Sequence, residues 1–133
     1  MNKIFNVGLI GCGHIAETYF RAHKYFNNFK IIKCADINHN AALKCAAANK
    51  IQAVSVKEIL TDDKIKVILN LTIPEAHYSV ARLAISHGKH VYSEKPLAIN
   101  LSDGIKLIRF AKKKKLYIGN APDTFLGGGI QKS

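Results

Sequence analysis

The chain has 133 residues, enough for one domain with a hydrophobic core. Its 48% hydrophobic and 22% charged residues are ordinary for a globular protein, and no apolar run reaches the 18 residues of a membrane span. The net charge of +11 suits nucleic acid, an anionic membrane surface or an anionic small ligand. The basic residues are spread along the chain, and the one cluster, "KKKK" at 112–115, is typical of a helix end, which argues against nucleic acid as a partner.

Strand-like and helix-like segments alternate from end to end. Strands are expected at 4–10, 30–37, 52–56, 66–73, 89–94 and 116–121, and helices at 13–25, 38–50, 57–63, from Pro74 to Gly88 and from Asn100 to about Lys115. The alternation predicts an α/β fold, a doubly wound and mostly parallel six-stranded sheet with helices on both faces. Such sheets bind ligands at the carboxyl ends of their strands.

Two of these helices carry apolar residues at helical spacing, the pattern of a buried face. The stripes are Ala76, Val80, Leu83 and Ala84 in the first helix, and Leu101, Ile105, Ile108 and Ala111 in the second.

The stretch "GCGHIA", residues 11–16, stands between the first strand and the first helix. Gly11 permits a tight turn, Gly13 lets the backbone approach a pyrophosphate, and Ala16 lets the helix pack closely on the sheet. The first helical residues, His14 and Ile15, would present free N–H groups and a positive dipole end to the phosphates. This strand–turn–helix context predicts a dinucleotide site.

Asp36 follows Ala16 by 20 residues, at the end of the second strand. A carboxylate there can accept hydrogen bonds from the ribose hydroxyls of the adenosine, and it would repel the 2′-phosphate of NADP. NAD is therefore the favoured cofactor and NADP the less favoured one, although Lys33 and His39 are near enough to weaken the preference. The alternative interpretation is a solvated aspartate in the turn "ADINHN".

A second set of candidates follows the fourth strand, in "NLTIPEAH". Thr72 and Ile73 are expected at the carboxyl end of that strand, beside the middle of the dinucleotide. Pro74 fixes the turn, and His77 lies in the first turn of the next helix. A capping or packing role for His77 is at least as well supported as a ligand contact.

Glu94 and Lys95 emerge after the fifth strand, in "YSEKPL", at the same expected edge. A lysine there could polarise a substrate oxygen or help move a proton while hydride passes, which makes Lys95 the catalytic candidate. The alternative is an ion pair on a surface loop.

The three cysteines, Cys12, Cys34 and Cys45, are odd in number and widely spaced. Because no CxxC pair exists, spacing predicts neither a disulfide framework nor a metal site. Free thiols fit a reducing cytoplasm, which is the expected compartment.

The motifs "GCGHIA", "LTIPEAH" and above all "GKHVYSEKPLA", together with Asp36, resemble the Gfo/Idh/MocA family of NAD(P)-dependent oxidoreductases. The resemblance implies an N-terminal Rossmann domain followed by an α/β substrate domain, with sugars, inositols and related polyols as frequent substrates. It also implies that Lys95 contributes to catalysis, and the Lys95–Pro96 peptide bond is often cis in that family.

Members of that family are typically more than twice as long, so residues 1–121 are expected to form the Rossmann domain and 122–133 the remnant of a connection to an absent substrate domain. On this reading the chain is a truncated oxidoreductase whose own activity is uncertain, and a small carbohydrate-like substrate binds only if a second domain is supplied. The alternatives are a non-enzymatic module that senses a nucleotide or binds a partner, and an inactive fragment. A missing domain would expose apolar surface near Phe125 and Leu126, where the chain could self-associate.

Overall fold

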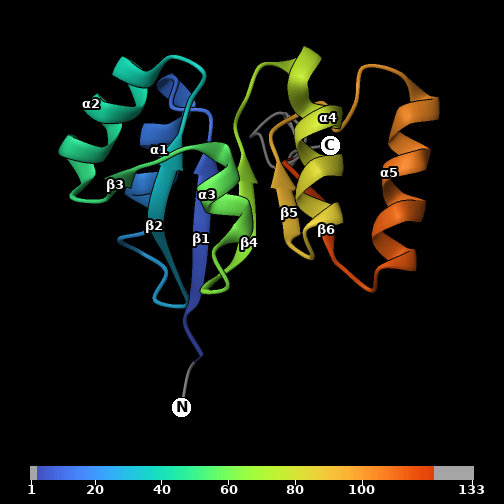
Figure 1. Cartoon of the computed structure of the whole chain (residues 1–133), viewed down its shortest axis with the longest axis horizontal. Coiled ribbons are helices and arrows are strands. Elements are labelled where there is room, and N and C mark those ends of the chain that lie inside the picture. The colour runs from blue at the N-terminus through green and yellow to red at the C-terminus, as the bar shows by residue number, and fades with distance from the viewer. Residues whose placement is uncertain (1–2, 122–133) are drawn as a thin grey trace, which may run out of the picture.

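The computed structural model describes residues 3–121, in which strands and helices alternate along the chain (Figure 1). The strands are β1 Phe5–Ile10, β2 Phe29–Ala35, β3 Gln52–Ala53, β4 Ile65–Asn70, β5 His90–Ser93 and β6 Ile118–Asn120. The helices are α1 His14–Ala22, α2 His39–Asn49, α3 Val56–Thr61, α4 Pro74–Ser86 and α5 Leu101–Lys113. The expected connecting segment 122–133, with its apolar residues, lies outside the described residues. Within the described range, none of the helices combines the length and the apolar character needed to cross a membrane.

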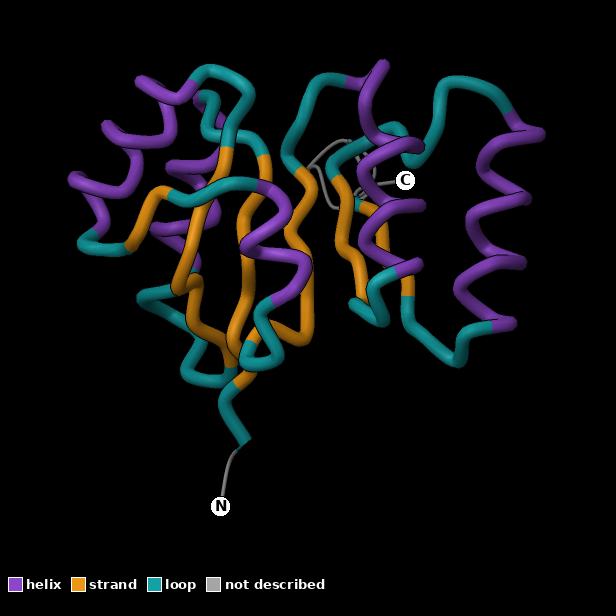
Figure 2. Tube along the Cα trace, viewed as in Figure 1, coloured by secondary structure: helices purple, strands orange, loops and turns teal. Residues whose placement is uncertain are grey.

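The strands form one parallel sheet in the order β3-β2-β1-β4-β5-β6. From β1 the chain builds outward to β3 on one side, then crosses to β4 and builds outward to β6 on the other (Figure 2). The predicted doubly wound sheet is confirmed. Because all strands are parallel, the loops that follow them meet at one edge, and the order reverses between β1 and β4.

Two hydrophobic clusters, one on each face of the sheet, hold the helices in place. On one face, alanines of α1 and α2 pack on buried strand residues such as Leu9 and Ile31. On the other face, α3, α4 and α5 pack on Ile65, Ile68 and Val91. Strands buried on both faces explain the near-continuous apolar run of β4 that is visible in the sequence.

The helix boundaries follow local capping. Asn100 caps α5 by accepting the N–H of Asp103 at 2.9 Å, as the sequence predicts. Lys112 and Lys113 occupy the last turn of α5, where positive charge offsets the helix dipole. The prediction of a strand over 52–56 is wrong beyond Ala53, because Ser55 caps α3 by accepting the N–H of Glu58.

The predicted apolar stripes are partly wrong. In α5 the buried side consists of Leu107 and Ala111, whereas Leu101 is 80% exposed and Ile108 51%. In α4 the sheet side carries Ala81, Ala84 and Ile85, and Leu83 is exposed. Neighbouring rows on a helix can each be apolar, and in α4 the row with smaller side chains allows the closer approach to the sheet.

Candidate functional site

The candidate site lies at the carboxyl edge of the sheet, where backbone hydrogen bonds tie neighbouring loops together. The first residue after each of three strands donates its N–H to the last residue of an adjacent strand: Gly11 to Ala35 at 2.9 Å, Leu71 to Ile10 at 2.8 Å and Glu94 to Asn70 at 3.0 Å. The pairing thus extends one residue beyond the strands. These bonds fix the loops after β1, β2, β4 and β5 relative to one another, and these four loops carry the predicted site residues.

Gly11 forms the tight turn that follows β1. Its φ is +103°, and a Cβ added there would lie 2.5 Å from the carbonyl carbon and oxygen of Leu71. Any side chain would therefore need both a strained backbone and a shift of the loop after β4. The predicted role of Gly11 in the turn is confirmed, and its second effect is to bring the loops after β1 and β4 together.

Gly13 has a different reason to be glycine. It is the N-cap of α1 with a φ of −80°, and a Cβ added there would meet no atom within 4 Å. It borders a surface hollow of about 290 Å³ that is also lined by Cys12, His14 and Glu17. The fold itself thus leaves room for a side chain at this position. A ligand that lies against the Gly13 backbone would leave no such room.

The N-terminus of α1 opens toward this hollow without a side-chain cap. The first N–H groups of a helix have no partner inside the helix, so those at His14 and Ile15 are available to an anion. Ala16 is 3% exposed and packs among the residues that join α1 to the sheet, as predicted. His14 is exposed, and Glu17 forms an ion pair with Arg21 at 2.6 Å.

Asp36 lies directly beside the glycine turn. Its Oδ2 accepts the backbone N–H of Cys12 at 2.7 Å, and its Oδ1 accepts the N–H of Asn38 at 2.7 Å. The structure therefore brings together the two parts of the predicted dinucleotide motif, 24 residues apart in the chain. The contact through the Cys12 amide was not predicted, since a backbone donor leaves no mark in the sequence.

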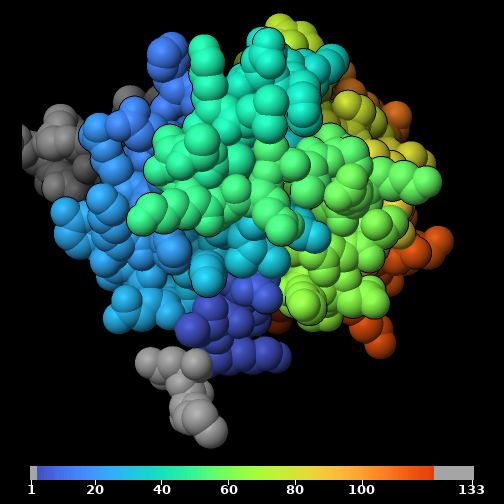
Figure 3. Space-filling model, turned by 60° about the vertical axis from the view of Figure 1, so that its left-hand side comes forward, coloured from blue at the N-terminus to red at the C-terminus, as the bar shows by residue number. Residues whose placement is uncertain are grey.

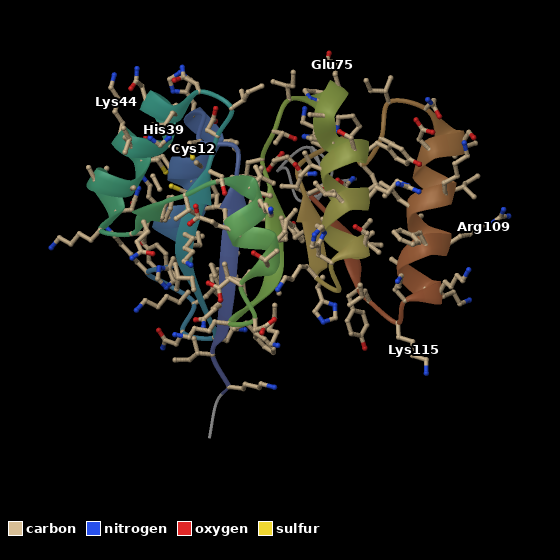
Figure 4. All side chains as sticks on the ribbon, viewed as in Figure 1. Cys12, His39, Lys44, Glu75, Arg109 and Lys115 are labelled. Atoms are coloured by element: carbon tan, nitrogen blue, oxygen red, sulfur yellow. The ribbon has the colours of Figure 1, made fainter. Side chains whose placement is uncertain are left out.

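The two basic residues near Asp36 differ in their surroundings. The Nζ of Lys33 forms an ion pair with Asp62 at 2.8 Å, so that ammonium is already engaged by another carboxylate. His39 is exposed at the first residue of α2, on the same side of the molecule as Cys12 (Figure 4).

The second part of the edge is built around Asn70, which is fully buried at the end of β4. Its Oδ1 accepts the Thr72 hydroxyl at 2.7 Å, and its Nδ2 donates to the carbonyl oxygen of His77 at 3.0 Å. Asn70 was missed as a site residue. A polar residue that interrupts the apolar run of a buried strand was the available signal.

His77 is 1% exposed and lies beneath the loops. Its Nδ1 faces the carbonyl oxygen of Pro96 at 2.5 Å, and its Nε2 faces that of Thr72 at 2.7 Å. Either tautomer donates one N–H to one of these two carbonyl oxygens, and the ring packs between the loop after β4 and the loop after β5. The structure gives His77 the packing role that sequence left open, and Ile73 and Pro74 form the exposed turn above it.

Glu94 and Lys95 follow β5 at the same edge. Glu94 accepts a hydrogen bond from the Tyr19 hydroxyl at 2.7 Å, which connects the loop after β5 to α1. Burial, with help from this bond, raises the pKa of Tyr19. Lys95 is exposed, and the Lys95–Pro96 peptide bond is cis, as the resemblance implied.

This edge thus combines an open helix N-terminus, a turn that tolerates a close ligand, a carboxylate and an exposed lysine. The sequence model described as "Oxidoreductase family, NAD-binding Rossmann fold" matches residues 5–121. An inositol 2-dehydrogenase/D-chiro-inositol 3-dehydrogenase of Lactiplantibacillus plantarum is 26% identical over 114 residues, which are 83% of this chain and 33% of that protein.

Solved oxidoreductase structures share the fold of this chain. Biliverdin reductase from Synechocystis, in complex with biliverdin and NADP+, superposes with a TM-score of 0.88 at 26% identity, over 95% of this chain and 40% of that one. GenD2 from gentamicin A biosynthesis, in complex with NAD, matches in fold with a TM-score of 0.85 at 18% identity, over 90% of this chain and 34% of that one. The chain spans about a third of the length of the curated relatives that it matches.

Proposed function

The chain belongs to the Gfo/Idh/MocA family of oxidoreductases and forms its NAD-binding Rossmann domain, and from this premise we propose that residues 11–16 and Asp36 hold the dinucleotide as NAD in preference to NADP. The observation that carries the proposal is the hydrogen bond from the Cys12 amide to Asp36. It places a carboxylate directly beside a glycine turn that borders an open hollow.

The pyrophosphate would lie over Gly13, where the hollow is free of protein atoms, and would accept hydrogen bonds from the first N–H groups of α1. The residues present fit this group, because the turn offers donors and the first helical turn carries no side-chain cap that would compete. The partners of Asp36 would then be the ribose hydroxyls, which can donate where the backbone N–H groups donate now.

Three features support NAD over NADP. Asp36 would repel a 2′-phosphate, Lys33 is paired with Asp62, and the turn after Asp36 continues with Ile37 and Asn38 rather than with a cation. The solved structures named above hold NAD in one case and NADP+ in another, so the preference rests on this chain's own residues.

Lys95 is proposed to act at the substrate oxygen. NAD, when bound, accepts a hydride from a carbinol carbon or, in its reduced form, supplies one to a carbonyl carbon. Lys95 would take the proton of the hydroxyl in the first direction and return it in the second. A small sugar-like or polyol substrate fits the dehydrogenase relative that acts on inositol, and the chain would contribute only part of that substrate's pocket.

The proposal is tested by titrating the purified chain with NADH and with NADPH, followed by the fluorescence of the reduced nicotinamide. We expect saturable binding of both, with the dissociation constant for NADH the lower. Asp36→Asn should weaken NADH about tenfold or more, because a hydrogen bond to a charged group contributes about 1.5–3 kcal/mol. The same substitution should weaken NADPH binding less, so that the ratio of the NADPH and NADH dissociation constants becomes smaller.

Asp63→Asn is the matched control, because it removes the same charge from an exposed residue just before β4, at the opposite edge of the sheet. It should leave both dissociation constants unchanged. Tighter binding of NADPH than of NADH to the unaltered chain would refute the cofactor preference, and equal effects of the two substitutions would refute the role of Asp36.

A further inference from the structure

The three cysteines, which are far apart in the sequence, meet in space. Cys12 lies in the glycine turn, Cys34 in β2 and Cys45 in α2, and their sulfur atoms all lie within 4.8 Å of one another. Figure 4 shows sulfur atoms beside the labelled Cys12, between α1 and α2. These are all the cysteines of the chain, and none of them is in a disulfide.

The spacing of the sulfur atoms is close to that of a metal site. Zinc–sulfur bonds are about 2.3 Å long, so thiolates around one ion in a trigonal or tetrahedral arrangement lie about 3.8–4.0 Å apart. The observed limit of 4.8 Å exceeds this by less than about 1 Å, which rotation of the side chains can supply.

The cluster is also reachable. Cys34 is fully buried, whereas Cys12 and Cys45 are partly exposed and line a hollow of about 520 Å³ between α1 and α2. The segment from α2 to α3 lies across the front of the molecule in Figure 3, in cyan to green. Arg21, Glu17, Lys24 and Lys44 line the same hollow. Because Arg21 and Glu17 form an ion pair, the net positive charge there comes from the two lysines, and it would offset the excess negative charge of three thiolates around one cation.

The side chain of Asn49 lies beside Cys45. Its amide nitrogen is 3.9 Å from the Cys45 sulfur and donates more closely to the Cys45 carbonyl oxygen, at 2.8 Å, which fixes the Asn49 side chain next to the cluster.

We propose that Cys12, Cys34 and Cys45 form a three-thiolate binding site for one soft, thiophilic metal ion. Soft sulfur ligands select Cu⁺ and Zn²⁺ over hard cations. As three metal–sulfur bonds form, three S–H groups release their protons to solvent. In the described part of the chain the group has these three members, so a fourth position stays open to water or a small thiol. The spacing of the cysteines gave no hint of this site, and it does not depend on the proposed binding of NAD.

The test is a titration of the reduced full chain with Cd²⁺ in the absence of nucleotide and oxygen, followed by the thiolate-to-metal charge-transfer absorption in the ultraviolet. We expect saturation at one ion per chain. Each of Cys12→Ala, Cys34→Ala and Cys45→Ala should weaken Cd²⁺ by more than about a hundredfold, since even residues that only orient metal ligands contribute about 10–100-fold. Competition with Zn²⁺ and with Cu⁺ identifies the preferred ion.

His87→Ala is the matched control, because it removes a metal-ligating side chain type from an exposed position after α4. It should leave the titration unchanged. Circular dichroism checks that each variant is folded. If Cys34→Ala, at a buried position, does not fold, the Cd²⁺ affinities of Cys12→Ala and Cys45→Ala still test the proposal.

Absence of a charge-transfer band in the folded, reduced chain would overturn the proposal. So would binding that persists in the cysteine variants or is lost in His87→Ala. If two of the cysteines form a disulfide under mild oxidation in a chain that does not bind Cd²⁺, the cluster is a redox pair and the metal site is wrong. NADH binding to the unaltered, metal-free chain is measured separately, so that failure of the metal site and failure of the proposed dinucleotide site can be told apart.

Discussion

The two halves of the sheet's carboxyl edge use polar residues in opposite ways. At the ends of β1 and β2, the glycine turn and Asp36 border an open hollow, and a ligand can reach their donors and acceptors. At the ends of β4 and β5, Asn70 and His77 are buried, and their hydrogen bonds go to the protein itself. The first half is the proposed binding surface, whereas the second is a support that sets the position of exposed residues above it.

This difference implies that substitutions in the two halves should separate binding from stability. Changes in the supporting half should lower the free energy of unfolding and change affinity little. Changes in the binding half should do the reverse, with Gly11 as the position where both meet, because it joins the loops after β1 and β4.

The largest effect is expected for Gly11→Ala. A positive φ costs an L-residue about 1–2 kcal/mol, and the added Cβ would press on the Leu71 carbonyl group, so the total loss of stability should be about 3 kcal/mol or more. NADH binding should be lost as well. Urea unfolding checks the stability, and a midpoint within error of the unaltered chain would show that the turn is not constrained as described.

Gly13→Val should leave the fold nearly intact and remove binding. Its Cβ meets no protein atom, so the cost to stability is at most about 1 kcal/mol, through a weaker N-cap. The valine would occupy the place of the pyrophosphate, and NADH affinity should fall by about a hundredfold. Calorimetric titration measures the affinity. Undiminished NADH binding would mean that the ligand does not approach this turn.

His77→Phe should show the reverse pattern. The substitution removes the one N–H that the ring donates to the carbonyl oxygen of either Thr72 or Pro96, which should lower the free energy of unfolding by about 2 kcal/mol. NADH affinity, measured at a temperature where the variant is folded, should change less than about threefold. His87→Phe, at the exposed C-cap of α4, is the control. Its ring nitrogen faces the Leu83 carbonyl oxygen at 2.9 Å, and because the position is exposed its loss should change the free energy of unfolding by less than about 0.5 kcal/mol. If His77→Phe kept its free energy of unfolding but no longer bound NADH, His77 would belong to the binding site and not to the support.

Tyr19→Phe tests a side-chain hydrogen bond that joins α1 to the loop after β5, and its effect should be the smallest. The lost bond to Glu94 should cost about 1 kcal/mol at neutral pH. Because the pKa of Tyr19 is raised in the folded state, its contribution is intact below about pH 10, where free tyrosine titrates, and is lost as the pH rises further. Unfolding from pH 8 to 11 should therefore show a shallower alkaline loss in Tyr19→Phe. An identical slope in both chains would contradict the raised pKa.

The sequence predicted the features that depend on neighbours along the chain. The turn at Gly11, the cap at Asn100 and the alternation of strands and helices are local, and all three are confirmed. The stripe of α5 was misassigned because periodicity shows which residues could be buried but not which row meets the sheet. The hydrogen bonds of Asn70 and the meeting of the three thiols depend on the order of the strands, so spacing in the sequence could not reveal them.

The most direct test of the central claim is a map of backbone amide chemical shifts with and without NADH. We expect the largest chemical-shift changes on residues 11–16 and 36–38, with smaller ones on 72–74 and 94–95. Lys89 and Lys115, at the opposite edge of the sheet, should not change. Changes centred on that opposite edge, or no saturable change in a folded chain, would contradict the assignment of the carboxyl edge as the dinucleotide site.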